Sequence, residues 1–323
     1  MEKRFGGLKH ILRAQDFSRK WIEEVLFPKT DEMEARTLKG DRGQPLFGKE
    51  MISLFAGESL RTRASFNIAM KRLGGEITFE TEDVRKFSSM AKGESLEDTI
   101  ITLNEYGADV IVLRYDEEGG AERAAAVSDI PIINAGDGGG QHPTQALLDL
   151  YVIQKHLNRI DGISIAMIGD LEKGRTVHSL AYLFGKFDGV KIYFVSPDNL
   201  KIKPDIKEYL NRHNVRFFET KDVREVASKV DVFYQTRTQT NLGTKPFDRA
   251  DEKNGFTVIN KQILDLAKKD SIILHPLPCT DEIVRSEVDP DRRAVYIKTK
   301  GDRMSQVKGG IYIRMAILWL LLF

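Results

Sequence analysis

Cysteine is almost absent from this sequence: Cys279 is the single one among 323 residues. One cysteine excludes a disulfide within the chain and any zinc site built from several cysteines. Because a protein in a reducing compartment needs no disulfides, this composition favours a cytoplasmic protein.

An excess of charge of one sign is also missing, since 49 lysines and arginines face 48 aspartates and glutamates. This balance predicts neither nucleic acid nor a membrane surface as a partner, so any anion site must be local. The longest apolar run, "MAILWLLLF", is shorter than the roughly 18 residues of a membrane-spanning helix. The opening "MEKRFGGLKHILRAQDF" has no apolar core of signal-peptide length.

The chain does contain alternating β-rich and helical segments. "MISLF", "EITFE", "DVIVLRY" and "PIINAGDG" alternate with helical patterns, and a second series after "ALLDLYVIQKHL" runs from "ISIAMIGD" to "AVYIKT", with "VREVASKV" among its helical segments. Such alternation predicts right-handed βαβ units and parallel sheets. We therefore expect an α/β fold of two doubly wound parallel-sheet domains joined by interdomain helices.

In open parallel sheets, ligands bind beyond the carboxyl ends of the strands. After "MISLF", the stretch "GESLRTRASF" places Arg61 and Arg63 in the first turn of a helix, where the helix dipole disfavours cations. One interpretation is a helix capped by Ser59 with two solvated arginines. An anion held by backbone N–H groups, the Thr62 hydroxyl and both guanidinium groups explains the placement better.

Further hydrogen-bond donors follow other parts of the first series. No acidic pair accompanies them, so we expect no metal ion. A site rich in donors and poor in carboxylates suits a dianionic substrate whose carbonyl group is polarised by hydrogen bonds. These donors are Ser88 and Lys92 in "FSSMAKGES", Arg114 after "DVIVL", and His142 and Gln145 after the glycine-rich "NAGDGGG".

The second series carries Arg175 after "ISIAMIGD", then Arg237 and Gln239 in "TRTQ", and the segment "HPLP" at 275–278. Arginines at two strand ends predict a second ligand that carries carboxylates. "GDLEKGRT" lacks the G-x-G-x-x-G spacing, which disfavours a nicotinamide cofactor and hence an oxidoreductase. For His178 and His275 we expect packing or supporting roles.

The motifs "SLRTR", "HPTQALLDLY", "GDLEKGRTVHSL", "TRTQ" and "HPLP…DEI" occur in this order across nearly the whole chain. In them the sequence resembles the catalytic chain of the aspartate carbamoyltransferase family, whereas ornithine carbamoyltransferases usually have cysteine at the "HPTQ" and "HPLP" positions. The resemblance implies a carbamoyl phosphate-binding domain over residues 1–143, joined by a C-terminal helix at about 303–323, and an aspartate-binding domain over 144–302. It also implies a homotrimer with shared active sites, and it admits a separate regulatory chain.

The same resemblance implies roles for individual residues. Catalytic roles fall to Arg61, Thr62, Lys92, Arg114 and His142. Aspartate would be bound by Lys92, Arg175, Arg237 and Gln239. Carbamoyl phosphate would be bound by Ser59, Leu60, Arg61, Thr62, Arg114, His142 and Gln145, by the backbone of Leu277 and Pro278, and by Ser88 and Lys92 of a neighbouring subunit.

The implied reaction needs no cofactor. The α-amine of L-aspartate attacks the carbonyl carbon of carbamoyl phosphate, and the tetrahedral intermediate expels phosphate, which accepts the amine proton. Thr62, Arg114 and His142 donate to the carbonyl oxygen as it becomes negative. Most of the rate would come from positioning two substrates between closing domains. The product, N-carbamoyl-L-aspartate, is an early intermediate of pyrimidine synthesis.

The sequence departs from the family pattern at two positions: Leu60 stands where threonine is usual, and Cys279 where arginine is usual. A hydrogen bond to a charged group contributes about 1.5–3 kcal/mol, so loss of the threonine hydroxyl would weaken phosphate binding roughly ten- to a hundredfold. Two alternatives therefore stay open. One is a catalytically impaired homologue that serves as a partner-binding or regulatory subunit, and the other is a carbamoyltransferase with a different amine acceptor.

Overall fold

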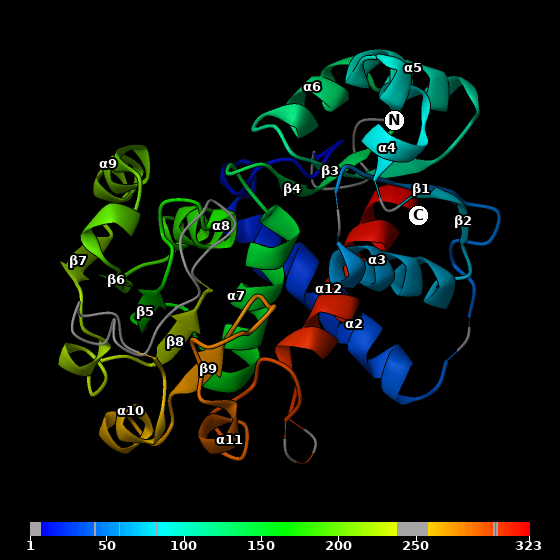
Figure 1. Ribbon diagram of the computed structural model, residues 1–323. Helices are drawn as coiled ribbons and strands as arrows, with labels where there is room; N and C mark the ends of the chain where they lie inside the picture. Colours follow the sequence, from blue (N-terminus) through cyan, green and yellow to red (C-terminus); the bar gives the residue numbers. More distant parts are fainter. Residues whose placement is uncertain are drawn as a thin grey trace. The chain divides into compact units, whose positions relative to one another are not determined.

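The computed structural model describes residues 8–41, 43–57, 59–81, 83–237, 258–299, 301 and 303–323. The chain divides into two compact units: unit 1 consists of Met1–Leu147 and Gly310–Phe323, and unit 2 of Leu148–Gly309. Each unit holds one sheet of parallel strands with helices packed on it (Figure 1). The predicted α/β class with two parallel sheets is confirmed. No helix in the described part of the chain is long and apolar enough to span a membrane.

Unit 1 contains a four-stranded sheet in the order β2-β1-β3-β4. All neighbouring strands are parallel. The strands β1 and β3 are almost entirely buried because their apolar runs lie in the middle of the sheet, whereas β2 forms an edge and is mostly exposed. The strands are β1 (Glu50–Phe55), β2 (Glu76–Glu80), β3 (Val110–Tyr115) and β4 (Ile132–Asp137).

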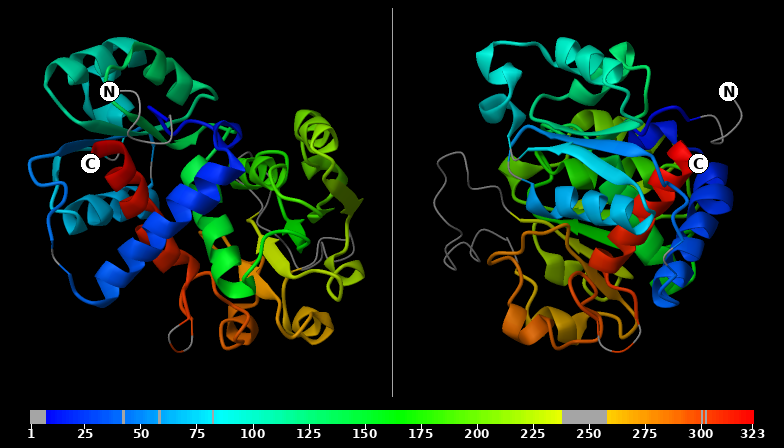
Figure 2. Two further views of the ribbon diagram at one scale, coloured as in Figure 1. Left: turned by 180° about the vertical axis from the view of Figure 1, so that it is seen from behind. Right: turned by 90° about the vertical axis from the view of Figure 1, so that its right-hand side faces the viewer.

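Helices cover both faces of this sheet (Figures 1 and 2). One face packs on α4 (Val84–Phe87), α5 (Leu96–Glu105) and α6 (Gly120–Val127). The other carries α3 (Leu60–Arg72), which α12 (Gln306–Leu322) reaches through Arg314, 5.2 Å from the ring centre of Phe66. The remaining helical segments are η1 (Ala14–Asp16), α1 (Arg19–Trp21), η2 (Ile22–Leu26), α2 (Phe27–Leu38) and η3 (Ser89–Lys92).

Unit 2 contains a five-stranded parallel sheet in the order β7-β6-β5-β8-β9. Successive side chains of a strand point to opposite faces of this sheet, as Phe233 and Tyr234 show. Phe233 packs in the apolar core under α10 and α11, while Tyr234 contacts α7 on the other face. The strands are β5 (Ser164–Ile168), β6 (Lys191–Val195), β7 (Arg216–Thr220), β8 (Val232–Gln235) and β9 (Ile272–Leu274). The helical segments are α7 (Pro143–Leu157), α8 (Arg175–Phe184), η4 (Asp198–Leu200), α9 (Pro204–Arg212), η5 (Val223–Glu225), α10 (Lys261–Leu266) and α11 (Arg285–Val288).

Two expected elements of unit 2 are absent. In "VREVASKV" the buried Val223, Val226, Ala227 and Val230 have helical spacing, but the segment forms only the short η5 and a turn, which suffice to bury them. "AVYIKT" was expected to be a strand, and it forms a single bridge between Ala294 and Ile273. Because β9 has three residues, a longer pairing has no partner there.

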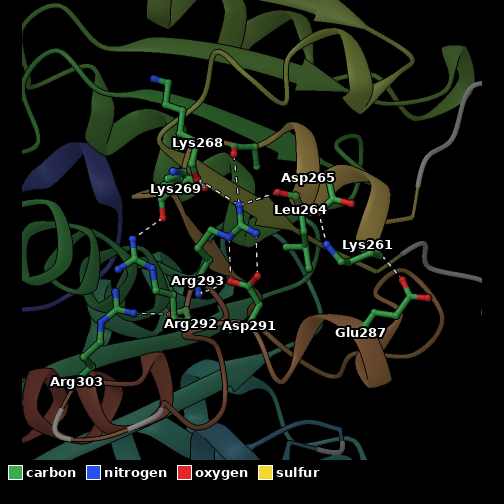
Figure 3. Close-up of polar contacts among 12 residues, drawn as sticks. Lys261, Leu264, Asp265, Lys268, Lys269, Glu287, Asp291, Arg292, Arg293 and Arg303 are labelled. Atoms are coloured by element: carbon green, nitrogen blue, oxygen red, sulfur yellow. Dashed lines mark hydrogen bonds and ion pairs between the residues drawn. The ribbon is translucent and has the colours of Figure 1, made fainter.

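Charged side chains tie together the amino ends of the strands in unit 2. Asp231, just before β8, accepts a hydrogen bond from Ser164 N and pairs with Lys268 Nζ, each at 2.8 Å. Arg293 donates to the carbonyl oxygen of Leu264 at the end of α10, also at 2.8 Å (Figure 3). This edge therefore has a structural role. It also carries an open hollow of about 390 Å³, lined by His156, Leu157, Arg159, Asp231, Lys268, Lys269 and Asp270, on the opposite edge from the expected ligand sites.

Candidate active site

The start of α3 lies at the carboxyl edge of the unit 1 sheet. It follows the end of β1, where Phe55 is paired with Arg114 of β3. Ala56 N donates to the Arg114 carbonyl oxygen at 2.8 Å, so the backbone leading to α3 passes beside Arg114. Arg61 is exposed in the first turn of α3, and Thr62 is partly exposed beside it.

Ser59 occupies the N-cap position of α3, but its side chain makes no capping hydrogen bond. The interpretation of Ser59 as a side-chain cap of this helix is therefore wrong. Its backbone, with φ −157° and ψ 68°, departs from the extended conformation that brings an N-cap hydroxyl over the first turn. Without a side-chain cap, the first turn keeps the positive end of its dipole directed at the sheet edge, which favours an anion there.

His142 and Gln145 lie at the same edge of the sheet, at the end of the loop after β4 and in the first turn of α7. The loop between β4 and α7 is held by Asp137, whose carboxylate accepts from Gln141 N at 2.6 Å and from Gly119 N at 3.2 Å. Burial raises the pKa of Asp137 despite these hydrogen bonds. His142 is 5% exposed and Gln145 9% exposed, so both side chains are fixed by packing.

The topology brings these groups together, because β1, β3 and β4 are neighbours in the sheet. Adjacent strands are about 4.8 Å apart, so Arg114, the first turn of α3 and the loop before α7 share one short stretch of the edge. Two guanidinium groups and a helix start can bind a phosphate there, and a buried imidazole can donate to a carbonyl oxygen.

Ser88 and Lys92 lie in a different part of unit 1, between α4 and the end of η3. The Ser88 hydroxyl donates to the Val84 carbonyl oxygen at 2.5 Å and accepts from Met90 N at 3.1 Å. Lys92 is exposed. The expected contribution of both residues to the site of a neighbouring subunit stays a prediction.

In unit 2 the predicted residues also follow neighbouring strands. Arg175 is the first residue of α8, after β5; Arg237 comes two residues after β8; and the segment 275–278 follows β9. Since β5, β8 and β9 are adjacent in the sheet, their carboxyl ends meet at one edge. Two partly exposed arginines there can each hold a carboxylate. Gln239 lies outside the described residues.

The segment "HPLP" has an unusual backbone. Leu277 adopts a left-handed conformation with φ 59°, and the peptide bond between Leu277 and Pro278 is cis. Burial raises the pKa of the neighbouring Cys279 thiol to about 12, so this side chain is neutral at pH 7. His178 is 2% exposed, and its Nε2 lies 2.8 Å from the Leu171 carbonyl oxygen, which agrees with the expected packing role.

Sequence reasoning assigned no role to a buried polar group behind this edge. Tyr234 Oη donates to Asp149 Oδ2 at 2.7 Å, and Gln306 Nε2 donates to Asp149 Oδ1 at 2.5 Å. Gln306 Oε1 accepts from His275 N at 2.8 Å. The available signal was Asp149 itself, a carboxylate inside the apolar helix "ALLDLYVIQKHL".

Each unit therefore has arginines at the carboxyl edge of its parallel sheet, an arrangement that suits a two-unit α/β protein with anionic ligands. The chain belongs to the aspartate/ornithine carbamoyltransferase family: residues 9–155 match its carbamoyl-P binding domain and residues 161–321 its Asp/Orn binding domain.

Individual relatives agree with this assignment. The chloroplastic aspartate carbamoyltransferase of Oryza sativa subsp. japonica is 50% identical over 320 residues, which cover 98% of this chain and 85% of the relative. The aspartate carbamoyltransferase catalytic subunit of Methanocaldococcus jannaschii is 43% identical over 311 residues, or 96% of this chain and 97% of the relative. The structure of Trypanosoma cruzi aspartate transcarbamoylase in complex with carbamoyl phosphate and aspartate has a TM-score of 0.88 and 37% identity, with 100% of this chain and 98% of that chain covered. The family resemblance predicted from the motifs is confirmed.

Proposed function

We propose that this chain transfers the carbamoyl group of carbamoyl phosphate to the α-amine of L-aspartate, which gives N-carbamoyl-L-aspartate and phosphate. The observation that carries the proposal is the match of both units to the Trypanosoma cruzi enzyme, whose structure holds both of these substrates. The chain itself supplies cations at the carboxyl edges of both sheets, where the substrates' phosphate and carboxylate groups would need them.

Unit 1 would bind carbamoyl phosphate. The phosphate is placed at the start of α3, held by Arg61, the hydroxyls of Ser59 and Thr62, and backbone N–H groups that include Leu60 N. The carbonyl oxygen then receives hydrogen bonds from Thr62, Arg114 and His142. As the amine adds to the carbonyl carbon, this oxygen becomes negative, and donors already fixed in place stabilise it without reorganisation. Burial of His142 between β4 and α7 supplies that fixed position.

Unit 2 would bind L-aspartate. Arg175 and Arg237 each take one carboxylate, and Gln239 adds a hydrogen bond. The carbonyl oxygens of Leu277 and Pro278 accept hydrogen bonds from the α-amine and the carbamoyl NH₂ group. The C–N bond forms, the C–O bond to phosphate breaks, and the departing phosphate takes the amine proton, so the reaction balances without another reactant.

The active protein would be a homotrimer in which Ser88 and Lys92 complete a neighbouring subunit's site. Unit 1 exposes large apolar side chains on β2, α3 and α4, which is the surface chemistry of a subunit interface. These side chains include Leu60, Ile68, Phe79 and Phe87. Lys92 is exposed on the same unit and is therefore available to another chain. A separate regulatory chain stays a further candidate partner.

A role in pyrimidine synthesis follows from the proposed product. A cytoplasmic location is proposed from the single cysteine. The rice relative is chloroplastic, and one cysteine suits the reducing stroma as well as the cytoplasm. Fractionation of source cells followed by immunoblotting distinguishes the two compartments.

The reaction is tested by mixing the purified protein with carbamoyl phosphate and L-aspartate and measuring phosphate and N-carbamoyl-L-aspartate. Equal amounts of both products are expected, and replacement of aspartate by ornithine should abolish them. Absence of turnover at saturating substrates would favour the impaired homologue that Leu60 and Cys279 suggest. Product formation with another amine in preference to aspartate would favour the alternative acceptor.

The shared site is tested with Lys92→Ala and Arg61→Ala proteins. Lys92→Ala alone is expected to be nearly inactive, and Arg61→Ala to be strongly impaired at carbamoyl phosphate concentrations below its raised KM. Mixed trimers contain some sites in which both residues are present, so mixing should restore part of the activity. Mass spectrometry of the mixture shows whether subunits have exchanged. No recovery despite exchange would contradict a site shared between subunits.

A further inference from the structure

His275, the residue after β9, has both of its ring nitrogens engaged. The side chain is 1% exposed. Its Nδ1 lies 2.8 Å from Leu277 N, and its Nε2 lies 2.6 Å from Glu282 Oε1. Because the Leu277 N–H can only donate, Nδ1 must be the accepting nitrogen, and the ring proton is on Nε2 and is donated to Glu282. The hydrogen bonds therefore fix one tautomer of the neutral ring.

The residue that His275 holds has a conformation that it would not adopt by itself. Leu277 has a φ of 59°, in the left-handed region that is disfavoured for a leucine. The hydrogen bond from its N–H to a side chain two residues earlier closes the turn at this point. Since φ and ψ of Leu277 set the direction of the following peptide group, this hydrogen bond also constrains where the Leu277 carbonyl oxygen points.

His275 is in turn held from two sides. Its ring is fixed by Glu282, whose carboxylate also accepts from Thr280 N at 3.2 Å and from Thr280 Oγ1 at 2.7 Å. Burial opposes the charge of Glu282, but the hydrogen bonds from His275 and Thr280 outweigh it and lower its pKa. The backbone N–H of His275 is fixed by Gln306, which is bound to Asp149. All of these groups belong to unit 2, so the arrangement is complete within it.

A metal ion is a competing interpretation of the same residues. Within the described part of the chain, ligand atoms of His275, Cys279 and Glu282 lie within 4.8 Å of one another. A metal on Nε2 would move the ring proton to Nδ1, where it would face the Leu277 N–H, and two donors would then oppose each other. The Cys279 thiol, with its pKa near 12, would also have to lose its proton. The hydrogen bonds of the structure therefore favour a clamp over a metal site, where the clamp is the hydrogen bond by which His275, itself held by Glu282, fixes the Leu277 backbone.

We propose that His275 is a positioning residue that, through the Leu277 N–H, aims the Leu277 carbonyl oxygen at the reacting substrates. Glu282 and Gln306 hold the imidazole for this task. The inference rests on the proposed function, which assigns this carbonyl oxygen to the substrates. It predicts that the histidine acts through the acceptor at Nδ1 rather than through its bulk or its charge.

Two substitutions separate the ring nitrogens. In His275→Asn, the amide oxygen lies near the position of Nδ1 and keeps an acceptor for the Leu277 N–H. In His275→Gln, the amide nitrogen lies near the position of Nε2 and keeps the donor to Glu282, but the acceptor is lost. His275→Gln should lower kcat/KM for aspartate about tenfold, as expected for one hydrogen bond, and His275→Asn by less than about threefold.

The remaining readouts show whether the effect is local. The inhibition constant of inorganic phosphate should stay unchanged in both variants, because phosphate is proposed to bind unit 1. Amide hydrogen exchange measures the Leu277 N–H directly and does not depend on catalysis; its protection should be lost in His275→Gln and kept in His275→Asn. His213→Gln is the control, since His213 is exposed on unit 2 and contacts none of these groups.

A double-mutant cycle tests the link to Leu277. Glycine adopts a left-handed φ without strain, so in a Leu277→Gly background the hydrogen bond from residue 277 to His275 is less necessary to maintain this backbone conformation. The effect of His275→Gln on kcat/KM should then fall to less than about threefold, a non-additive result. Melting temperatures identify any variant that has lost the fold. In the folded variants, amide exchange at Leu277 shows whether His275 acts as a hydrogen-bond acceptor or only fills space.

The proposal is overturned if His275→Asn and His275→Gln impair catalysis equally and the cycle is additive, because His275 would then serve only to fill space. It is also overturned if the Leu277 amide keeps its protection in His275→Gln. These outcomes differ from failure of the proposed function. In that case the wild-type protein forms no N-carbamoyl-L-aspartate, while the exchange measurement still reports on the clamp.

Discussion

Gly169 provides a test of how closely the chain packs where the neighbouring strands β5 and β8 end, beside the proposed aspartate site. It follows β5 with a φ of +121°, and a Cβ built on it would lie 2.5 Å from both the carbonyl oxygen and Oγ1 of Thr236. Ordinary van der Waals contact begins at 3.4 Å. Thr236 cannot easily move, since its N and Oγ1 both donate to the Ile168 carbonyl oxygen, at 2.8 and 3.0 Å.

Gly169→Ala is therefore expected to destabilise the protein and to displace the residue that follows Thr236, which is Arg237. The unfavourable φ costs about 1–3 kcal/mol. Overpacking against backbone adds about 1–3 kcal/mol. We expect a total loss of roughly 2–6 kcal/mol in the free energy of unfolding, together with a KM for aspartate that rises at least severalfold. The KM for carbamoyl phosphate should change little.

Gly162→Ala is the matched control. Gly162 also has a positive φ, +70°, but a Cβ there meets nothing within 4 Å. Its cost should be confined to backbone strain, about 1–2 kcal/mol, with no change in either KM. Urea unfolding followed by circular dichroism and steady-state kinetics measure both variants. Equal losses of stability and unchanged KM values in the two variants would refute the claim that Gly169 is required by the approach of Thr236.

Other predictions concern single side chains. Arg61→Ala should raise the KM for carbamoyl phosphate roughly ten- to a hundredfold in steady-state assays, by loss of a charged hydrogen bond. Leu60→Thr should lower the same KM, because it adds a hydroxyl at the phosphate. Tyr234→Phe should lower the urea-derived free energy of unfolding by about 1–3 kcal/mol, because buried Asp149 loses a donor. Burial opposes the charge of Glu282, but its hydrogen bonds lower the pKa of this carboxyl group below the usual 4.5. The ionised carboxylate therefore stabilises the fold above pH 4.5, and this stabilisation is lost as the pH falls through the lower pKa of the folded state. Between about pH 6 and pH 3, wild type should therefore lose more stability than Glu282→Gln.

The parts of the fold that could be predicted are those set by local periodicity. Apolar runs such as "DVIVL" become buried central strands because both faces of a parallel sheet are covered. Phe66, Ala69 and Met70 recur at helical spacing, and they form the buried face of α3. Where several local structures bury the same residues, the periodicity does not decide between them. For this reason "VREVASKV" forms the short η5 and a turn instead of a longer helix.

The predicted site residues could be named from their types and their places after strands. Their supporting groups could not, because the contacts that define them join distant parts of the chain. Asp149 and Gln306 are 157 positions apart, and no local pattern pairs them. The conformation of Leu277 is similar: sequence gives no reason for a left-handed leucine, and the reason appears only once His275 and Glu282 are seen beside it.

Leu60 combines two features that each look unfavourable in a single chain. It is 73% exposed although it is a leucine, and it opens a helix whose next residue is an arginine. A bound phosphate reverses the electrostatic penalty on Arg61, but it gives no reason for an exposed apolar side chain. A neighbouring subunit of the proposed trimer would give one, since an apolar contact there is stabilised by excluding water. If that contact exists, Leu60→Thr adds a hydroxyl for the phosphate and also weakens the trimer, so its gain in affinity should disappear at low protein concentration. A gain that is the same at every concentration would place Leu60 at the phosphate alone.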